Sequence, residues 1–179
     1  MKSTLALLII MTASAVGYTQ QLRIKHTSEG QAYVESEAMK IENDNDLVME
    51  NGQSVHEISF AYYGSSAGDK SMRMTVSFTE SVKREIPAGS MVIIKLGNGE
   101  IVGSRTLASY SGVRRDDNVY ASNFYVYFNN TTARKIAASG IKKVRLAYEK
   151  KRFDWQADEN KSKTLAMGVF NTDLNVFAK

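Results

Sequence analysis

Apolar and polar side chains alternate along most of the chain that follows its first twenty residues. The segment 71–79 is the clearest case, because methionine, valine and phenylalanine alternate there with arginine, threonine and serine. The same two-residue period runs through segments 55–63, 119–128 and 141–149. Residues 22–26 and 32–41 also have the composition of extended chain. A period of two, with polar residues opposite the apolar ones, predicts strands that bury one face and expose the other.

Glycine, asparagine and proline separate these segments. Residues 97–99, Gly-Asn-Gly, lie between the strand-like segments 91–96 and 100–102. Both residue types tolerate positive φ, so this spacing predicts a hairpin. Pro87, the only proline of the chain, predicts a turn that leads into the strand at 91–96.

Helix signals are few. Thr131 or Thr132 can cap a short helix near 132–139, and a glycine follows where that helix would end. The segment 162–178 fits two alternatives, a helix or a final pair of strands, because Gly168 interrupts an otherwise helical apolar stripe.

Many short strands separated by turns predict a mainly-β fold, an antiparallel β-sandwich or a small barrel. The short helix near 132–139 would cap one end, and a C-terminal helix would join it if the helical alternative holds. The regular exchange of strands and helices that builds a parallel nucleotide-binding sheet is absent from the pattern.

The N-terminus has the layout of a cleavable export signal. Lys2 supplies the positive start, residues 5–11 form an apolar core, and residues 13–17 are small. The apolar core is shorter than the roughly 20 residues that span a bilayer, although an uncleaved N-terminal anchor remains the alternative. We therefore expect a signal peptide at 1–19 and a single β-rich domain at 20–179.

The absence of cysteine from the chain excludes several chemistries. It leaves no residue for lipid attachment, no disulfide framework, no thiolate metal site and no cysteine nucleophile. We expect an exported protein of the periplasm or cell surface that is not a lipoprotein and has no membrane span after signal cleavage.

The net charge of the whole chain is +4, and removal of Lys2 with the signal would leave +3. Positive and negative residues are interspersed, so this mild excess favours solubility, and export makes nucleic acid a poor partner. One basic cluster, Lys150, Lys151 and Arg152, falls in an expected turn. It is either a solvated loop or a contact patch for an acidic glycan, a lipopolysaccharide phosphate or another anion.

Catalytic and metal-binding signatures are weak. The segment 64–68 matches the Gly-x-Ser-x-Gly pattern of serine hydrolases, which needs a helix after the serine and a histidine downstream. The next expected element is a strand, and both histidines, His26 and His56, lie upstream. Their spacing also matches no metal-ligand signature. We therefore predict no catalytic residue, no metal site and no cofactor, and a small-residue loop at 64–68.

Aromatic residues are the strongest candidates for binding. If Phe124, Val126 and Phe128 face the core, alternation turns Tyr125 and Tyr127 to the opposite face. Tyrosine offers a large rigid surface with a polar group, so such a face can stack on sugar rings or anchor a protein. Three further aromatic residues belong to the same binding candidate: Tyr110, Tyr120 and Trp155. The alternative is ordinary strand propensity, with burial of the two tyrosines under the C-terminal segment.

The order of segments also resembles a family. A strand and glycine hairpin at 92–102, an aromatic strand at 123–128, a short helix at 131–140 and the strand at 141–146 follow one another. This order resembles small exported, uncharacterised β-rich proteins of Bacteroidetes-type Gram-negative bacteria, over roughly residues 70–150. The resemblance implies a compact β domain in the periplasm or at the cell surface. It supplies no catalytic residues to transfer, and Val144 and Leu146 stand where its pattern prefers isoleucine.

These observations lead to one preferred hypothesis and two alternatives. The preferred hypothesis is a non-enzymatic binding or interaction module of the cell envelope, with an envelope protein or a glycan as partner. The candidate surface comprises Tyr125, Tyr127, Lys150, Lys151 and Arg152. The alternatives are a glycan- or peptidoglycan-directed hydrolase that uses carboxylates from distant strands, and a structural subunit of an envelope assembly.

Overall fold

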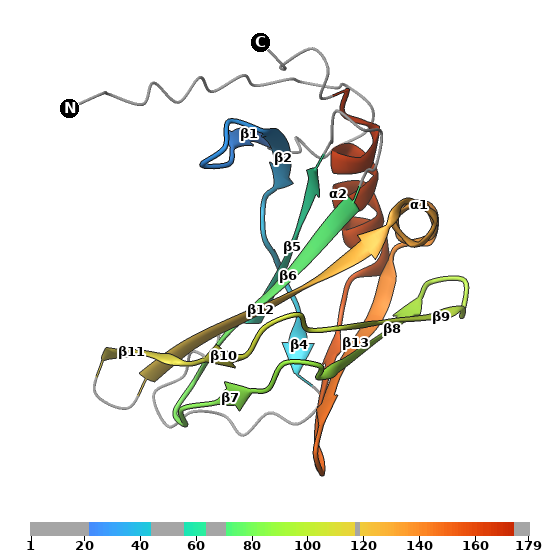
Figure 1. Cartoon of the computed structure of the whole chain (residues 1–179). Coiled ribbons are helices and arrows are strands. Elements are labelled where there is room, and N and C mark those ends of the chain that lie inside the picture. The colour runs from blue at the N-terminus through green and yellow to red at the C-terminus, as the bar shows by residue number, and fades with distance from the viewer. Residues whose placement is uncertain (1–21, 44–55, 64–70, 117–118, 174–179) are drawn as a thin grey trace, which may run out of the picture.

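The computed structural model describes residues 22–43, 56–63, 71–116 and 119–173, which form two large antiparallel sheets and two helices (Figure 1). The larger sheet has the strand order β1 (Leu22–His26), β2 (Ala32–Ser36), β5 (His56–Tyr63), β6 (Ser71–Glu80), β12 (Val119–Asn129) and β11 (Val113–Asp116), with β3 (Met39–Lys40) also paired to β5. The smaller sheet has the order β4 (Glu42–Asn43), β14 (Lys151–Gln156), β13 (Ile141–Tyr148), β8 (Met91–Leu96) and β9 (Ile101–Arg105). A short pair joins β7 (Glu85–Ile86) to β10 (Tyr110–Ser111). The predicted antiparallel, mainly-β fold is confirmed.

The chain passes between the two large sheets at both of their edges. At one edge, β3 pairs with β5 of the larger sheet, and β4 pairs with β14 of the smaller sheet directly afterwards. At the other edge, the chain leaves β9 and returns to the larger sheet through β10 and β11. The Ser104 hydroxyl of β9 joins the two large sheets there, because it donates to the Tyr127 carbonyl of β12 at 3.1 Å. The Tyr110 hydroxyl of β10 donates to the Tyr125 carbonyl, also of β12, at 3.4 Å.

The core lies between the inner faces of the two sheets, where the alternating apolar positions meet. The largest fully buried side chains are Trp155, Tyr62, Phe60, Phe78, Phe124, Met39, Ile58, Met72, Met74, Ile86, Ile94 and Leu96. Trp155 donates its indole N–H to Nδ1 of the buried His56 at 3.0 Å. Because Nδ1 accepts this bond, it carries no proton, and His56 is a hydrogen-bonded histidine of the core.

Helix α1 (Asn130–Ser139) confirms the short helix expected near 132–139, but neither Thr131 nor Thr132 caps it. The cap is Asn129, whose side chain accepts a hydrogen bond from the Thr132 amide at 2.9 Å. The reason is that β12 continues to Asn129, the last residue with the extended backbone that an N-cap needs. Gly140, at φ +68°, ends the helix as expected.

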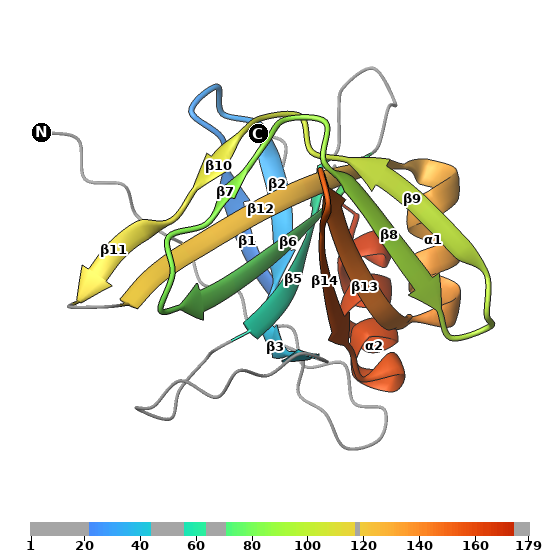
Figure 2. The same cartoon turned by 90° about the horizontal axis from the view of Figure 1, so that it is seen from below.

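Helix α2 (Glu159–Asn171) decides between the two C-terminal alternatives in favour of a helix. Its cap, Asp158, accepts from the Lys161 amide, so the helix begins before the segment from which it was predicted. The buried Ser162 hydroxyl accepts from the Ile141 amide at 2.7 Å and ties α2 to the start of β13. The apolar residues of both helices belong to the common core, and Figure 2 shows both helices behind the strands of the smaller sheet.

Strand β14 was not predicted from the sequence. Charged residues at its start and Asp154 within it hide a short alternation, in which only Phe153 and Trp155 are apolar. These two side chains complete the core because β14 pairs with β13 along its whole length.

Several expectations fall on other parts of the chain. The predicted signal peptide 1–19, the serine motif at 64–68 and residues 174–178 lie outside the described residues. Among the residues that are described, no helix has the length and apolar character needed to cross a membrane.

Candidate functional site

The outer face of the larger sheet carries a row of tyrosine side chains. Five of them, which we call the tyrosine row, come from β2, β5, β12 and β10: Tyr33, Tyr63, Tyr127, Tyr125 and Tyr110. The strand register assembles part of this row, since Tyr33 pairs with Tyr63 across β2 and β5. Each of the five residues is half-buried, and the core positions of the three longest of these strands point to the opposite face.

The rings of the tyrosine row contact one another in sequence. The ring centroids are 4.8 Å apart for Tyr33 and Tyr63, which are stacked, and 6.2 Å apart for Tyr63 and Tyr127. Tyr127 and Tyr125 follow at 5.8 Å, and Tyr125 and Tyr110 at 5.2 Å, both edge to face. Distances in this range are typical of favourable aromatic pairs, so the row is a continuous and preorganised aromatic surface.

Arg73 of β6 lies in the middle of this surface. Its guanidinium carbon is 5.4 Å from the Tyr63 ring centroid and 5.6 Å from that of Tyr125. Its Nη2 atom is 3.3 Å from the Glu35 carboxylate, which also pairs with Lys25. Within the described part of the chain, the buried Nε of Arg73 has no hydrogen-bond partner. Contacts with the two rings and the ion pair with Glu35 therefore hold this side chain in place.

Burial changes the acidity of two phenols in the row. It raises the pKa of Tyr63 to about 12, and the nearby positive charge of Arg73 opposes this shift without cancelling it. Burial also raises the pKa of Tyr110 to about 12, with a further contribution from the neighbouring Tyr125. Both hydroxyls stay protonated at neutral pH. The Tyr63 hydroxyl can donate a hydrogen bond to a ligand, whereas the Tyr110 hydroxyl already donates to the Tyr125 carbonyl.

We expect an alkaline titration followed by phenolate absorbance to show these two late-ionising phenols. An unfolded chain ionises its tyrosines near pH 10, while folded Tyr63 and Tyr110 hold their protons up to about pH 12. Stability that is fully present below pH 10 is therefore lost as the pH rises through about 12. Tyr63→Phe should remove absorbance from the late part of the titration. If Tyr63→Phe instead removes a phenol that ionises near pH 10, this assignment is contradicted. Circular dichroism at each pH would show that the protein is still folded.

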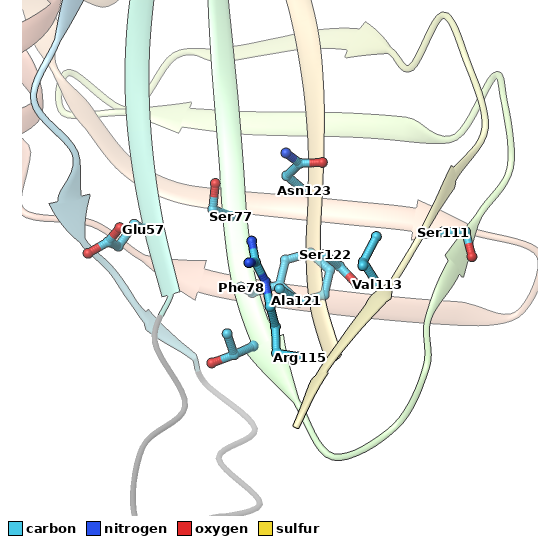
Figure 3. Close-up of a pocket in the computed structure, with 10 residues that line it drawn as sticks. Glu57, Ser77, Phe78, Ser111, Val113, Arg115, Ala121, Ser122 and Asn123 are labelled. Carbon is cyan, nitrogen blue, oxygen red and sulfur yellow. The ribbon is translucent and has the colours of Figure 1, made fainter. Parts of the chain in front are cut away.

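A polar hollow continues the same face beyond the tyrosine row (Figure 3). Its volume is about 410 Å³, and its polar lining includes Glu57, Ser77, Thr79, Asn123, Ser111 and Arg115. Asn123 lies two residues before Tyr125 on β12, so the hollow borders the row directly. Arg115 extends from β11 toward Ser77 of β6 in Figure 3. In the described ranges, neither Glu57 nor Arg115 has an ion-pair partner, so both charged groups remain available to a ligand.

The structure brings together some of the aromatic candidates and separates others. Tyr125, Tyr127 and Tyr110 lie in the tyrosine row, while Tyr120 occupies the same strand face as the buried Phe124. Trp155 is 1% exposed and belongs to the core, so it is unable to contact a ligand. The alternative expectation, that the C-terminal segment buries these tyrosines, is wrong for the described residues, because α2 packs on the core side of the sheet.

No sequence pattern identified Tyr33, Tyr63, Arg73 or the charged residues of the hollow as site residues. Tyr63 was assigned to a strand, but no pattern within one segment indicates that its neighbour is Tyr33. The sequence does indicate that each of these side chains points outward from its own strand. It does not indicate which outward side chains of other strands lie next to it.

The basic cluster does not form one patch. Lys150 lies in the two-residue turn between β13 and β14, but Lys151 and Arg152 already belong to β14, so a turn was wrong for both. Successive strand residues point to opposite faces. Lys151 accordingly lies 5.7 Å from the ring centroid of the inward-facing Tyr148, while Arg152 lies beside Asp154 on the outer face.

Comparisons with known proteins do not indicate a function for this chain, so functional inference rests on the tyrosine row and the hollow. Across the described ranges, no group of three or more histidine, cysteine, aspartate or glutamate side chains is arranged to hold a metal ion. No family model, curated protein or solved structure matches this chain.

Proposed function

We propose that this protein is an exported, non-enzymatic binding module of the cell envelope and that it binds a glycan on the tyrosine row. The observation that carries the proposal is the continuous row of five tyrosine rings beside a polar hollow. The layout of the N-terminus as an export signal supports the envelope setting.

The chemistry of the face supports a glycan over a fully apolar ligand. A sugar ring offers an apolar face of C–H groups and an edge of hydroxyl groups. Tyrosine rings can contact the apolar face while their hydroxyls stay in water or bond to the sugar. The hollow adds an amide, hydroxyls, a carboxylate and a guanidinium, which together donate to and accept from sugar hydroxyls.

The lining of the hollow supports binding rather than hydrolysis. Most glycoside hydrolases use two carboxyl groups that flank the scissile bond. Glu57 is the single carboxylate among the lining residues of this hollow. Glu35, beside the tyrosine row, is already paired with Arg73 and Lys25. The face therefore offers contact area and hydrogen bonds without an evident acid and base.

A double substitution tests the tyrosine row. Tyr125→Ala with Tyr127→Ala is expected to weaken binding to immobilised peptidoglycan or to soluble envelope polysaccharide by about 30-fold or more, the loss typical of central aromatic residues in an interface. Binding would be measured by co-sedimentation and calorimetry, and retention of the fold by the midpoint of urea unfolding.

Tyr120→Ala is the matched control, because it removes the same ring from the same strand on the core-side face. It is expected to lower stability while leaving affinity unchanged. Equal affinity of wild type and the double variant would exclude the row as the binding site. Absence of binding by the wild type to both glycans would refute the proposed ligand class.

A further inference from the structure

The outer face of the smaller sheet is a second surface with an unusual composition. The register aligns Arg145 of β13 with Asp154 of β14 and Ile93 of β8, all of which point away from the core. The neighbouring rows place Lys143 beside Lys95, and Ala147 between Arg152 and Met91. We call this surface the basic face.

Positive charge dominates the basic face. Its cationic side chains are Lys95, Arg105, Lys143, Arg145 and Arg152. Its acidic side chains are Glu42 and Asp154. Among the strand residues of this face, five cations against two acids leave a net charge of +3, whereas the whole chain carries only +4. Glu149, in the turn after β13, lies beside Met91 and Arg105. The excess charge of the protein is therefore concentrated here.

Asp154 organises part of this charge. Arg145 donates to its two carboxylate oxygens at 2.6 and 2.9 Å, and Lys143 and Arg152 approach at 3.5 and 3.8 Å. The Asp154 side chain is only 9% exposed beneath them, and the hydrogen bonds from Arg145 lower its pKa. One carboxylate thus holds three cations in a fixed array without neutralising all of them.

The same face exposes apolar side chains. Ile101 is 67% exposed and Met91 is 39% exposed, and the half-buried Ile93 lies between their rows. The solvent face of an antiparallel sheet is ordinarily polar. Both helices and the core lie on the other side of this sheet, so packing within the described part of the chain does not account for the exposure.

We propose that the basic face docks on the anionic surface of a lipid bilayer. Phosphate-bearing headgroups match the array of arginine and lysine side chains, each of which adds to the attraction of a negatively charged membrane. Insertion of Ile101 and Met91 at the interface removes apolar surface from water. A soluble anionic polysaccharide would satisfy the charges but would leave these apolar side chains in water, so the combination favours a lipid surface.

Vesicle flotation tests the proposal with the full chain. We expect binding to vesicles of phosphatidylglycerol mixed with phosphatidylcholine, little binding to phosphatidylcholine alone, and release by high salt. Lys95→Gln with Arg152→Gln should weaken binding about 10-fold or more, because each lysine or arginine near an anionic bilayer contributes appreciably. Ile101→Ser should weaken binding to the mixed vesicles as well.

Lys161→Gln with Lys163→Gln is the matched control, since it removes the same charge from exposed positions of α2. All variants share one N-terminal segment, so their differences report the basic face alone. Equal losses in the control and the face variant would overturn the proposal by showing a dependence on overall charge. A second result would overturn the proposal in favour of a polysaccharide. In that case the protein would not bind vesicles but would bind a soluble polyanion, and Ile101→Ser would leave the affinity for the polyanion unchanged. The tyrosine row takes no part in this test, so its outcome is independent of the proposed glycan binding.

Discussion

Trp155→Ala is expected to lower the free energy of unfolding by about 3–5 kcal/mol, the usual cost of truncating a fully buried tryptophan. The Trp155 ring is 1% exposed, and the rings of Phe78 and Phe124 lie 5.9 and 6.2 Å from it between centroids. Truncation leaves a cavity at the centre of the core. It also leaves Nδ1 of the buried His56 without its 3.0 Å donor, which adds a desolvation cost.

Urea unfolding followed by circular dichroism would measure this effect, because Trp155 is the only tryptophan and its fluorescence disappears in the variant. Trp155→Phe serves as the control, since it keeps an aromatic ring and loses mainly the indole N–H and part of the volume. It should cost clearly less than the alanine substitution. A loss below about 1 kcal/mol for Trp155→Ala would be inconsistent with a tryptophan in the packed core.

Gly140→Ala is expected to destabilise the protein by roughly 3 kcal/mol or more. Gly140 follows α1 with φ +68° and ψ 177°, a backbone conformation that is nearly restricted to glycine. A methyl group there would overlap the backbone oxygen of Glu159 and lie 3.0 Å from Cβ of Lys163. Strain and overlap therefore act together at the junction of α1, α2 and β13.

Gly99→Ala separates these two causes. Gly99 also has a positive φ, +88°, but a methyl group at this position meets no atom within 4 Å in the described part of the protein. Only backbone strain remains, so the expected cost is about 1–2 kcal/mol. Thermal unfolding of both variants would measure the difference. Equal melting temperatures would show that α2 does not pack against Gly140 as described.

The two proposed surfaces belong to different sheets, because each is the outer face of one of them. A protein that rests on a bilayer through the basic face would therefore use a different sheet from the one that carries the tyrosine row. This arrangement would allow a lipid surface and a glycan to be held at the same time. Simultaneous binding of vesicles and glycan is a direct consequence of the two proposals taken together.

Much of the secondary structure could be predicted because it depends on local rules. The alternation at 71–79 predicts the inward methionines of β6, and the Gly-Asn-Gly sequence predicts the hairpin between β8 and β9. Strand periodicity and turn preferences act within a few residues, so a single segment contains the information. Where the local pattern is broken by charge, as in β14, the prediction failed although the strand is central to the core.

In the strands with a clear alternation, the sequence by itself determined which side chains face inward, and with them much of the core and the outward position of Tyr125 and Tyr127. Only the tertiary structure decided which outward residues become neighbours. It placed Tyr33 beside Tyr63 and gathered Lys143, Arg145 and Arg152 around Asp154. The physical reason is that strand pairing joins segments far apart in the chain, and the alternation within one strand carries no record of the partner or the register that its backbone hydrogen bonds will select.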